Sequence, residues 1–300
     1  MEFKKVVRDI RTLKIQGAES IAKEAVNALY HIVHKSKAYD AQQLILELHK
    51  AKVMLEEARP TEPCLRNALR YVLHDVHRQD LVQLVKDLDE RIQYVQNYFQ
   101  SSEQRIAEIG MKKLPEKAAI FTICHSSTVM MVLAKAKFSQ KRFHVNNVET
   151  RPLFQGRVTA KELAALGVKV YHYIDSAARL ALKHSDVFLF GADAVQSDGK
   201  IANKIGTELF LEVARRYDIP AYCCVLSWKF DPLTIYGPNE PIENRRKEEV
   251  WPEAPKGVTI MNPAFEMVEP GLVTGIISEL GVYKPETFVD EVRRAQPWMF

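Results

Sequence analysis

The fold is decided by the stretch AIFTICHSSTVMMVL at residues 119–133. Its first part, from Ala119 to Ile123, is apolar and β-branched and predicts a buried strand. The polar turn CHSST at 124–128 follows at once, and the apolar run VMMVL at 129–133 then predicts a helix. A buried strand that passes directly into a helix is typical of a βαβ unit, so this stretch indicates a parallel sheet.

The same alternation continues toward the C-terminus. Further strand-like runs lie at 142–145, 169–174, 186–190 and 221–225, with helix candidates between them at 159–166, 176–183 and 207–216. This order predicts a Rossmann-like α/β domain, residues 115–300, whose parallel sheet is covered on both faces. Two later apolar segments, 258–261 and 272–277, are interpreted as core. In such a sheet, ligands bind at the carboxyl ends of the strands.

The chain before Pro115 predicts helices alone. Apolar residues within 22–33, 42–56 and 80–110 recur at the spacing that places them on one face of a helix. We therefore expect an N-terminal all-helical domain, residues 1–114, followed by the α/β domain.

Composition excludes several classes of protein. A hydrophobic fraction of 47% and a charged fraction of 27% are typical of a globular protein. No apolar run approaches the roughly 20 residues of a membrane-spanning helix, and the N-terminus lacks the apolar core of a signal peptide. We expect a cytoplasmic protein without a membrane partner. The 42 basic and 38 acidic residues are mixed along the chain, which argues against nucleic-acid binding. The four cysteines have neither metal nor disulfide spacing, so we expect reduced thiols and no metal.

Two residues at strand ends suit acid–base chemistry. Cys124 follows the first strand and precedes a helix, whose N-terminus would lower the thiol pKa and favour the thiolate. The alternative is a buried structural cysteine ahead of an ordinary helix cap. Asp193 directly follows the apolar strand at 186–190, at the rim where acid–base residues lie, although an aspartate there also suits a loop cap.

Other strand ends offer groups that suit a phosphorylated sugar. The hydroxyl residues at 126–128 leave backbone N–H groups available to an anion. Asn203 and Lys204, expected at a helix start, suit a sugar hydroxyl and a phosphate. Arg151 suits an anion, or pairs with Glu149. Lys229 follows the strand at 221–225, where the alternative is a solvated surface charge. The case rests on the convergence of four strand ends.

Together these segments resemble the family that groups ribose-1,5-bisphosphate isomerases, methylthioribose-1-phosphate isomerases and the regulatory subunits of the exchange factor for translation initiation factor two. The resemblance rests on Cys124-His125-Ser126 and on the segments at 149–156, 191–193 and 203–207. It is closest to the archaeal-type ribose-1,5-bisphosphate isomerases, through the segments at 59–61, 67–70, 175–179, 229–232 and 262–265.

The resemblance implies conversion of α-D-ribose 1,5-bisphosphate to D-ribulose 1,5-bisphosphate in nucleoside monophosphate degradation. It implies Cys124 as proton acceptor and Asp193 as proton donor, with an enolate-type intermediate and no cofactor. His125 is interpreted as structural. The implied substrate contacts are Gln16, Gly17, Ala18, Glu19, Arg59, Ser126, Ser127, Thr128, Asn203, Lys204 and Lys229. The family usually has arginine at the position of Gln16. Activation by a nucleotide such as AMP and assembly into dimers or hexamers are further implications.

Two alternatives remain. A methylthioribose-1-phosphate isomerase would share Cys124 and Asp193 but needs one phosphate site and an apolar pocket. A non-catalytic subunit resembling translation initiation factor 2B would act through protein contacts. Such subunits tend to lose the cysteine or the aspartate, whereas this chain has both.

Overall fold

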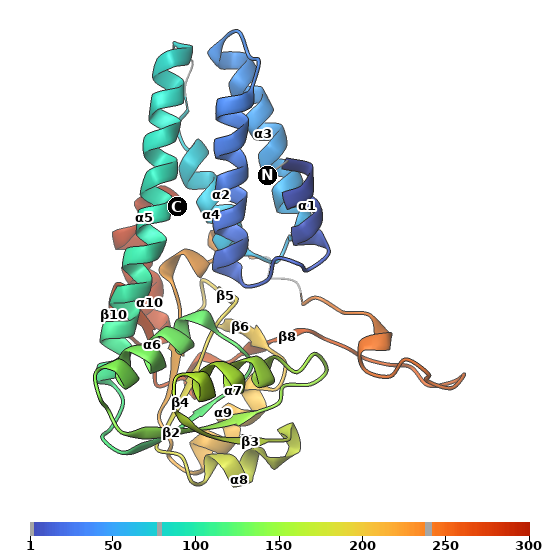
Figure 1. Cartoon of the computed structure of the whole chain (residues 1–300), viewed down its shortest axis with the longest axis vertical. Coiled ribbons are helices and arrows are strands. Elements are labelled where there is room, and N and C mark those ends of the chain that lie inside the picture. Colours follow the sequence, from blue (N-terminus) through green and yellow to red (C-terminus); the bar gives the residue numbers. More distant parts are fainter. Residues whose placement is uncertain (1–2, 77–79, 238–241) are drawn as a thin grey trace. The chain divides into compact units, whose positions relative to one another are not determined.

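The computed structural model describes residues 3–76, 80–237 and 242–300, which form two compact units (Figure 1). The first unit is the chain up to Ser101 together with Gln296–Phe300, and the second is Ser102–Ala295. The change from a helical to an alternating pattern at Pro115 comes just after the end of a long helix, α5. The division between the two units falls within this helix, between Ser101 and Ser102.

The first unit is helical. Its elements are α1 (Phe3–Arg11), α2 (Ala18–Lys35), α3 (Ala41–Ala58), α4 (Pro63–Leu73) and the start of α5 (Leu81–Lys112). The apolar face predicted within 22–33 is the buried face of α2. Asp40 begins α3 by accepting a hydrogen bond from the Gln43 backbone N–H at 2.8 Å, and Pro63 begins α4, as expected at a position that needs no N–H donor.

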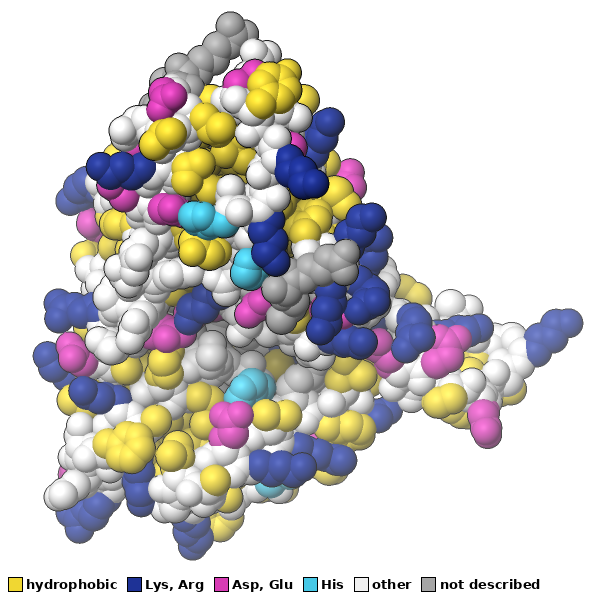
Figure 2. All heavy atoms as spheres, turned by 45° about the horizontal axis from the view of Figure 1, so that its top comes forward, with side chains coloured by type: hydrophobic (Ala, Val, Ile, Leu, Met, Phe, Trp, Pro, Cys, Tyr) yellow, Lys and Arg dark blue, Asp and Glu magenta, His cyan; other side chains and the backbone are white. Residues whose placement is uncertain are grey.

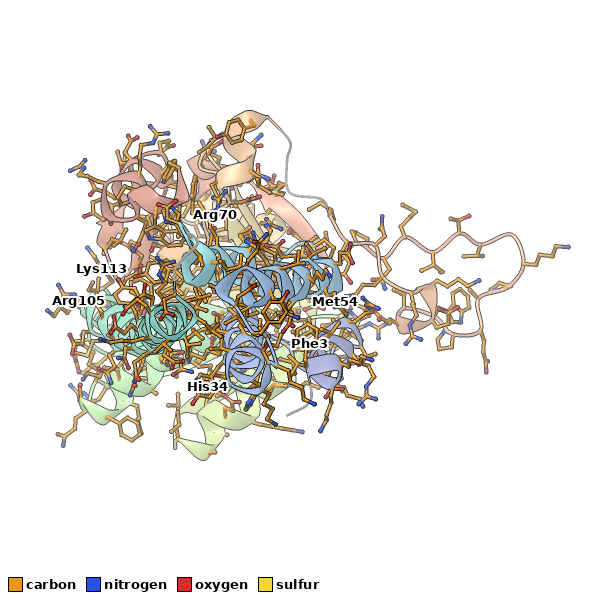
Figure 3. All side chains as sticks on the ribbon, turned by 90° about the horizontal axis from the view of Figure 1, so that it is seen from above. Phe3, His34, Met54, Arg70, Arg105 and Lys113 are labelled. Carbon is orange, nitrogen blue, oxygen red and sulfur yellow. The ribbon has the colours of Figure 1, made fainter. Side chains whose placement is uncertain are left out.

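The C-terminal residues belong to this helical unit. The Arg70 side chain on α4, labelled in Figure 3, donates to the Met299 carbonyl at 2.7 Å. Gln296 donates to the Tyr98 hydroxyl at 3.0 Å, and the Trp298 ring lies edge-on to Tyr71 with ring centroids 5.1 Å apart. Through these contacts the residues Gln296–Phe300 are part of the helical unit, whereas the sequence placed them in the α/β domain.

The second unit is built on a seven-stranded sheet in the order β10-β9-β7-β4-β1-β2-β3. Its strands are β1 (Ala118–Thr122), β2 (Phe143–Val148), β3 (Lys169–Tyr173), β4 (Val187–Phe190), β7 (Ala221–Cys224), β9 (Gly275–Ser278) and β10 (Gly281–Tyr283). All neighbours pair in parallel except β10 with β9. Every residue of β1 and β4 is buried, which confirms a parallel sheet covered on both faces.

The connecting helices and a small second sheet complete this unit. The helices are α6 (Ser127–Phe138), α7 (Gln155–Ala165), α8 (Ala178–Leu182), α9 (Thr207–Arg216) and α10 (Pro285–Ala295). The second sheet joins β5 (Ala194–Val195), β6 (Ile201–Lys204) and β8 (Phe265–Val268) in antiparallel pairs. Asn203 and Lys204 are therefore the last residues of a strand, whereas the sequence placed them at a helix start.

One predicted core segment is exposed. Val258 is 47% and Met261 74% exposed, because the segment between residue 242 and β8 leaves the body of the α/β unit (Figures 1 and 3). The other predicted core segment is buried, since Ile276 and Ile277 lie in β9 with no exposed surface. In Figure 2, acidic and basic side chains are both distributed over the face shown.

The start of α7 packs so closely on β2 that only glycine fits. A Cβ added to Gly156 would lie 1.7 Å from the Val148 carbonyl oxygen. We expect Gly156→Ala to lower the free energy of unfolding in urea by about 3 kcal/mol. In Gly271→Ala nothing lies within 4 Å of the new Cβ, so this control should change stability by less than about 0.5 kcal/mol. Equal effects of the two substitutions would contradict the steric argument.

Candidate active site

The sheet order brings four strand ends together. β7, β4, β1 and β2 are consecutive neighbours, so the polar segments that follow them lie along one edge of the sheet. The chain order reverses between β1 and β4, because β2 and β3 follow β1 on one side and β4 lies on the other, and open α/β sheets bind ligands at such a reversal. Cys124 follows β1 and Asp193 follows β4, one on each side of this point.

The backbone of Cys124 is held in a left-handed conformation, with φ of 61°. Such a conformation costs a non-glycine residue on the order of 1–3 kcal/mol. Two threonine hydroxyls maintain it: the Cys124 N–H donates to Thr150 Oγ1 at 2.9 Å, and Thr159 Oγ1 donates to the Cys124 carbonyl at 2.7 Å. The thiol therefore projects from a peptide that is fixed at both ends.

Asp175 fixes the turn that carries Thr150. Its two carboxylate oxygens accept from the backbone N–H groups of Thr150 at 2.8 Å and Arg151 at 2.7 Å. The exposed Arg151 guanidinium donates to the Val250 carbonyl at 3.1 Å, while Glu149 pairs with Arg157 at 3.0 Å. The pairing of Arg151 with Glu149 that the sequence offered is therefore not found, whereas its contact with an anion stays a prediction.

His125 supports the cysteine from the side, in agreement with its interpretation as structural. Its Nδ1 lies 3.1 Å from Thr159 Oγ1. Because the Thr159 hydroxyl already donates to the Cys124 carbonyl, the ring must donate through Nδ1–H. His125 therefore orients the threonine that holds Cys124.

The thiol of Cys124 is a neutral group in this environment. Burial raises its pKa to about 11. The positive charge of Lys204 and a hydrogen bond from the His125 backbone lower the pKa, whereas the charges of Asp193 and Asp175 raise it. The thiolate that the helix terminus was expected to favour is thus opposed by desolvation, which outweighs the groups that favour its charge. Asp193 and Lys204 therefore lie close enough to the thiol for their charges to change its pKa.

The residues 126–128 begin α6. Ser126 accepts a hydrogen bond from the Val129 backbone N–H at 3.4 Å, as a helix cap does. Ser127 is exposed and Thr128 is buried. A Cβ on Gly191 would lie 2.5 Å from Ser126 Oγ, so the glycine after β4 allows this cap to approach the Asp193 segment.

Lys204 is a buried cation. The residue is only 7% exposed, and Nζ lies 4.8 Å from the centre of the Phe265 ring. Within the part of the chain that the structure describes, no carboxylate forms an ion pair with it. The neighbouring Asn203 donates to Thr207 Oγ1 at 3.0 Å. A desolvated ammonium that has no carboxylate partner among the described residues is suited to an anionic ligand.

Lys229 is buried as well, which excludes the alternative of a solvated surface charge. It is 8% exposed, and its Nζ donates to the Ala192 carbonyl at 2.6 Å. Asp193 is the next residue, and its backbone N–H donates to the Ala202 carbonyl at 2.9 Å. Lys229 therefore anchors the backbone of the turn that carries Asp193.

The remaining predicted contacts lie in the helical unit. The Gln16 amide donates to the Leu13 carbonyl at 2.8 Å. Gly17 has φ of 85° and precedes α2, which begins at Ala18. Glu19 is buried and its carboxylate lies 2.7 Å from Lys23 Nζ. Arg59, also buried, lies 3.4 Å from the Glu62 carboxylate. The charged members of this group have counter-ions within their own unit.

The sequence did not identify the residues that support the site. They are Thr150, Thr159 and Asp175. The Gln155 side-chain oxygen is buried and has no hydrogen-bond partner among the described residues, which makes it a further candidate contact. Asp175 follows the predicted strand at 169–174, so the rule for strand ends would have found it. Thr150 lies within the segment at 149–156 that carries the family resemblance, whereas Thr159 has no such signal.

Comparison with known proteins places the chain in a family. It matches the initiation factor 2 subunit family over residues 14–285. It is 36% identical to the ribose 1,5-bisphosphate isomerase of Thermococcus kodakarensis over 99% of this chain and 95% of that protein. It is 32% identical to the methylthioribose-1-phosphate isomerase of Pelotomaculum thermopropionicum, over 95% of this chain and 83% of that protein.

Solved structures agree with this assignment at the level of the fold. The crystal structure of translation initiation factor eIF-2B from Pyrococcus horikoshii superposes with a TM-score of 0.84 at 24% identity, covering 96% of this chain and 98% of that one. The chain belongs to the initiation factor 2 subunit family, which confirms the resemblance noted in the sequence. In residues 3–76, 80–237 and 242–300, no helix has the length and apolar character needed to cross a membrane.

The raised thiol pKa can be tested by alkylation. Because only the thiolate reacts, we expect iodoacetamide to modify Cys124 with a pH midpoint near 11 rather than 9.0, followed by mass spectrometry of the labelled peptide. Lys204→Met should move the midpoint higher, and Cys124→Ser should abolish labelling. Since the folded pKa exceeds the unfolded value, this thiol contributes stability below pH 9.0 that is lost as the pH rises through about 11. A midpoint below 9.0 would contradict the assignment.

The hydrogen bond from Thr159 to the Cys124 backbone can be tested by measuring stability. Thr159→Val removes the hydroxyl that donates to the Cys124 carbonyl and leaves a part-buried acceptor without its donor. We expect the free energy of unfolding in urea to fall by about 2 kcal/mol. Thr159→Ser retains the hydroxyl and should lose less than half as much. If valine and serine had the same effect, the hydrogen bond would not be the cause.

Proposed function

We propose that the chain converts α-D-ribose 1,5-bisphosphate to D-ribulose 1,5-bisphosphate, with Cys124 and Asp193 as the catalytic pair. It is an aldose–ketose isomerase. One observation carries the assignment of residues: Cys124 and Asp193 follow adjacent central strands, and the charge of Asp193 acts on the Cys124 thiol.

The chemistry requires an acid and a base on the same substrate. A ribose 1-phosphate ester has no free aldehyde, so the ring must open by protonation of the ring oxygen while the proton on C2 is removed. Asp193 is the acid in this scheme, and the thiolate of Cys124 is the base. The product is an enol between C1 and C2, with the 1-phosphate still attached. Transfer of the C2 hydroxyl proton to Asp193 and of the thiol proton to C1 then gives the ketose and restores both groups.

The electrostatics of the pair support these roles. In the reactive form, the Asp193 carboxyl is protonated and Cys124 is a thiolate, so the pair carries one proton and that proton is on Asp193. Because the negative charge of Asp193 raises the thiol pKa, protonation of this carboxylate makes loss of the thiol proton easier. Lys204 favours the thiolate further. The protonated form of Asp193 and the thiolate form of Cys124 therefore stabilise each other, although the resting thiol is neutral.

Substrate binding is assigned mainly to buried polar groups. Lys204, a cation without a carboxylate partner among the described residues, is the proposed phosphate contact. Asn203 and the residues 126–128 are proposed contacts to the sugar. Gln16 to Glu19, Arg59 and Lys229 remain proposed contacts on the strength of the family resemblance. We further propose a place in nucleoside monophosphate degradation in the cytoplasm, activation by AMP and a homo-oligomeric state.

A methylthioribose-1-phosphate isomerase is the second candidate, because the same catalytic pair would serve it and a relative of that name is 32% identical. The bisphosphate enzymes are preferred because the alignment spans 95% of the Thermococcus kodakarensis protein but 83% of the methylthio enzyme.

The proposal is tested by offering the purified protein each sugar phosphate separately, with and without AMP, and following ketose formation. We expect turnover of the bisphosphate, and a loss of at least about a hundredfold in both Cys124→Ser and Asp193→Asn. Asp198→Asn is the matched control, because this half-exposed aspartate pairs with Lys200 rather than with the site, and it should retain activity.

The other outcomes assign the protein differently. Turnover of methylthioribose 1-phosphate alone would make it a methylthioribose-1-phosphate isomerase. Turnover of neither sugar by a folded protein would contradict the isomerase and favour a regulatory subunit.

A further inference from the structure

Strand β8 contacts Lys204 in a way that the catalytic scheme does not use. It pairs antiparallel with β6, so that Phe265 lies opposite Lys204 and Glu266 lies opposite Asn203. We propose that Phe265 and Glu266 are positioning residues, which hold the Lys204 ammonium where it binds a phosphate of the substrate. This inference rests on the proposed function.

Phe265 stabilises the lysine without neutralising it. The face of an aromatic ring attracts an ammonium through its quadrupole, and Nζ lies 4.8 Å from the Phe265 ring centre. A carboxylate in the same place would form an ion pair and compete with a phosphate for the charge. The ring also restricts a long side chain that would otherwise lose rotamer freedom when the substrate binds. The lysine is therefore ordered in advance while its charge stays available.

Glu266 fixes the turn that follows Lys204. Its carboxylate accepts from the Glu208 backbone N–H at 2.9 Å, and the nearby backbone N–H groups of Gly206 and Thr207 also favour its charged form. Burial raises the pKa of Glu266, and these hydrogen bonds oppose that rise. The carboxylate thus occupies the N-terminus of α9, where an anion would otherwise bind. A substrate phosphate would therefore bind Lys204 rather than the N-terminus of α9.

A second set of bonds locks the same turn from the other side. Thr207 Oγ1 donates to the Lys204 carbonyl at 2.6 Å and accepts from the Asn203 amide at 3.0 Å. The Ile205 N–H donates to the Ala264 carbonyl of the β8 segment at 3.2 Å. The backbone of Lys204 is thereby fixed, so the direction of its side chain depends on the Phe265 ring.

The test measures binding of ribose 1,5-bisphosphate by calorimetry in the Asp193→Asn background, where turnover does not consume the ligand. We expect Phe265→Leu to raise Kd about fivefold through loss of the ring, and Phe265→Tyr to stay within about twofold because the ring is kept. Tyr171→Leu is the matched control, since it removes a ring 4.7 Å from Lys169 Nζ on the edge strand β3, and should leave Kd unchanged. Glu266→Ala should weaken binding, and Glu266→Gln, which keeps an acceptor, should restore it.

A double-mutant cycle separates positioning from general damage to the fold. In a Lys204→Met background, Phe265→Leu should have no further effect on Kd, because the ring then has no ammonium to hold. An equal loss with and without Lys204, or equal effects of leucine and tyrosine, would overturn the positioning role while leaving the proposed function intact. Failure of the Asp193→Asn protein itself to bind the bisphosphate would instead overturn the proposed function.

Discussion

Strand β1 is hydrogen-bonded in parallel to β2 on one side and to β4 on the other, with Ile120 opposite both Val145 and Val187. All residues of β1 and β4 are buried, and Thr122 at the end of β1 is the one polar residue in these two strands. Polar groups can enter only where the strands end. Because the chain leaves β1 toward one neighbour and returns beside the other, Cys124 and Asp193 are brought to the same point from distant parts of the sequence.

Burial then sets the electrostatics of that point. A charge in such a place is costly unless something stabilises it, and the two lysines solve this problem in different ways. Lys229 donates to the backbone carbonyl of Ala192, so its charge supports the turn that carries Asp193. Lys204 faces the Phe265 ring and keeps its charge free of a carboxylate among the described residues. One lysine thus orients the proposed acid, and the other is available to an anionic substrate.

The framework of the fold follows from local sequence, whereas the finer features of the site depend on distant residues. The predicted strands at 119–123, 142–145, 169–174, 186–190 and 221–225 all belong to the large sheet, and the helix predicted at 207–216 is α9. The small sheet was missed because β5 is only two residues long and β6 pairs with β8 across a long stretch of chain. A turn motif shows the helix terminus that favours a thiolate, but not the desolvation that raises the pKa of the Cys124 thiol. The hydrogen bonds of Thr150 and Thr159 likewise exist only in the folded protein.

The substitution of Gln16 for the arginine usual in the family is consistent with this division of charge. The Gln16 amide is held by the Leu13 carbonyl, and the carboxylate of Glu19 at the start of α2 is neutralised by Lys23. Arg59 has Glu62 as a counter-ion in the same unit. In the proposed enzyme, recognition of substrate charge therefore falls more heavily on the α/β unit, and on Lys204 in particular. Such a lysine binds a phosphate best when a neighbour restricts its side chain without forming an ion pair with it. An aromatic ring meets both conditions.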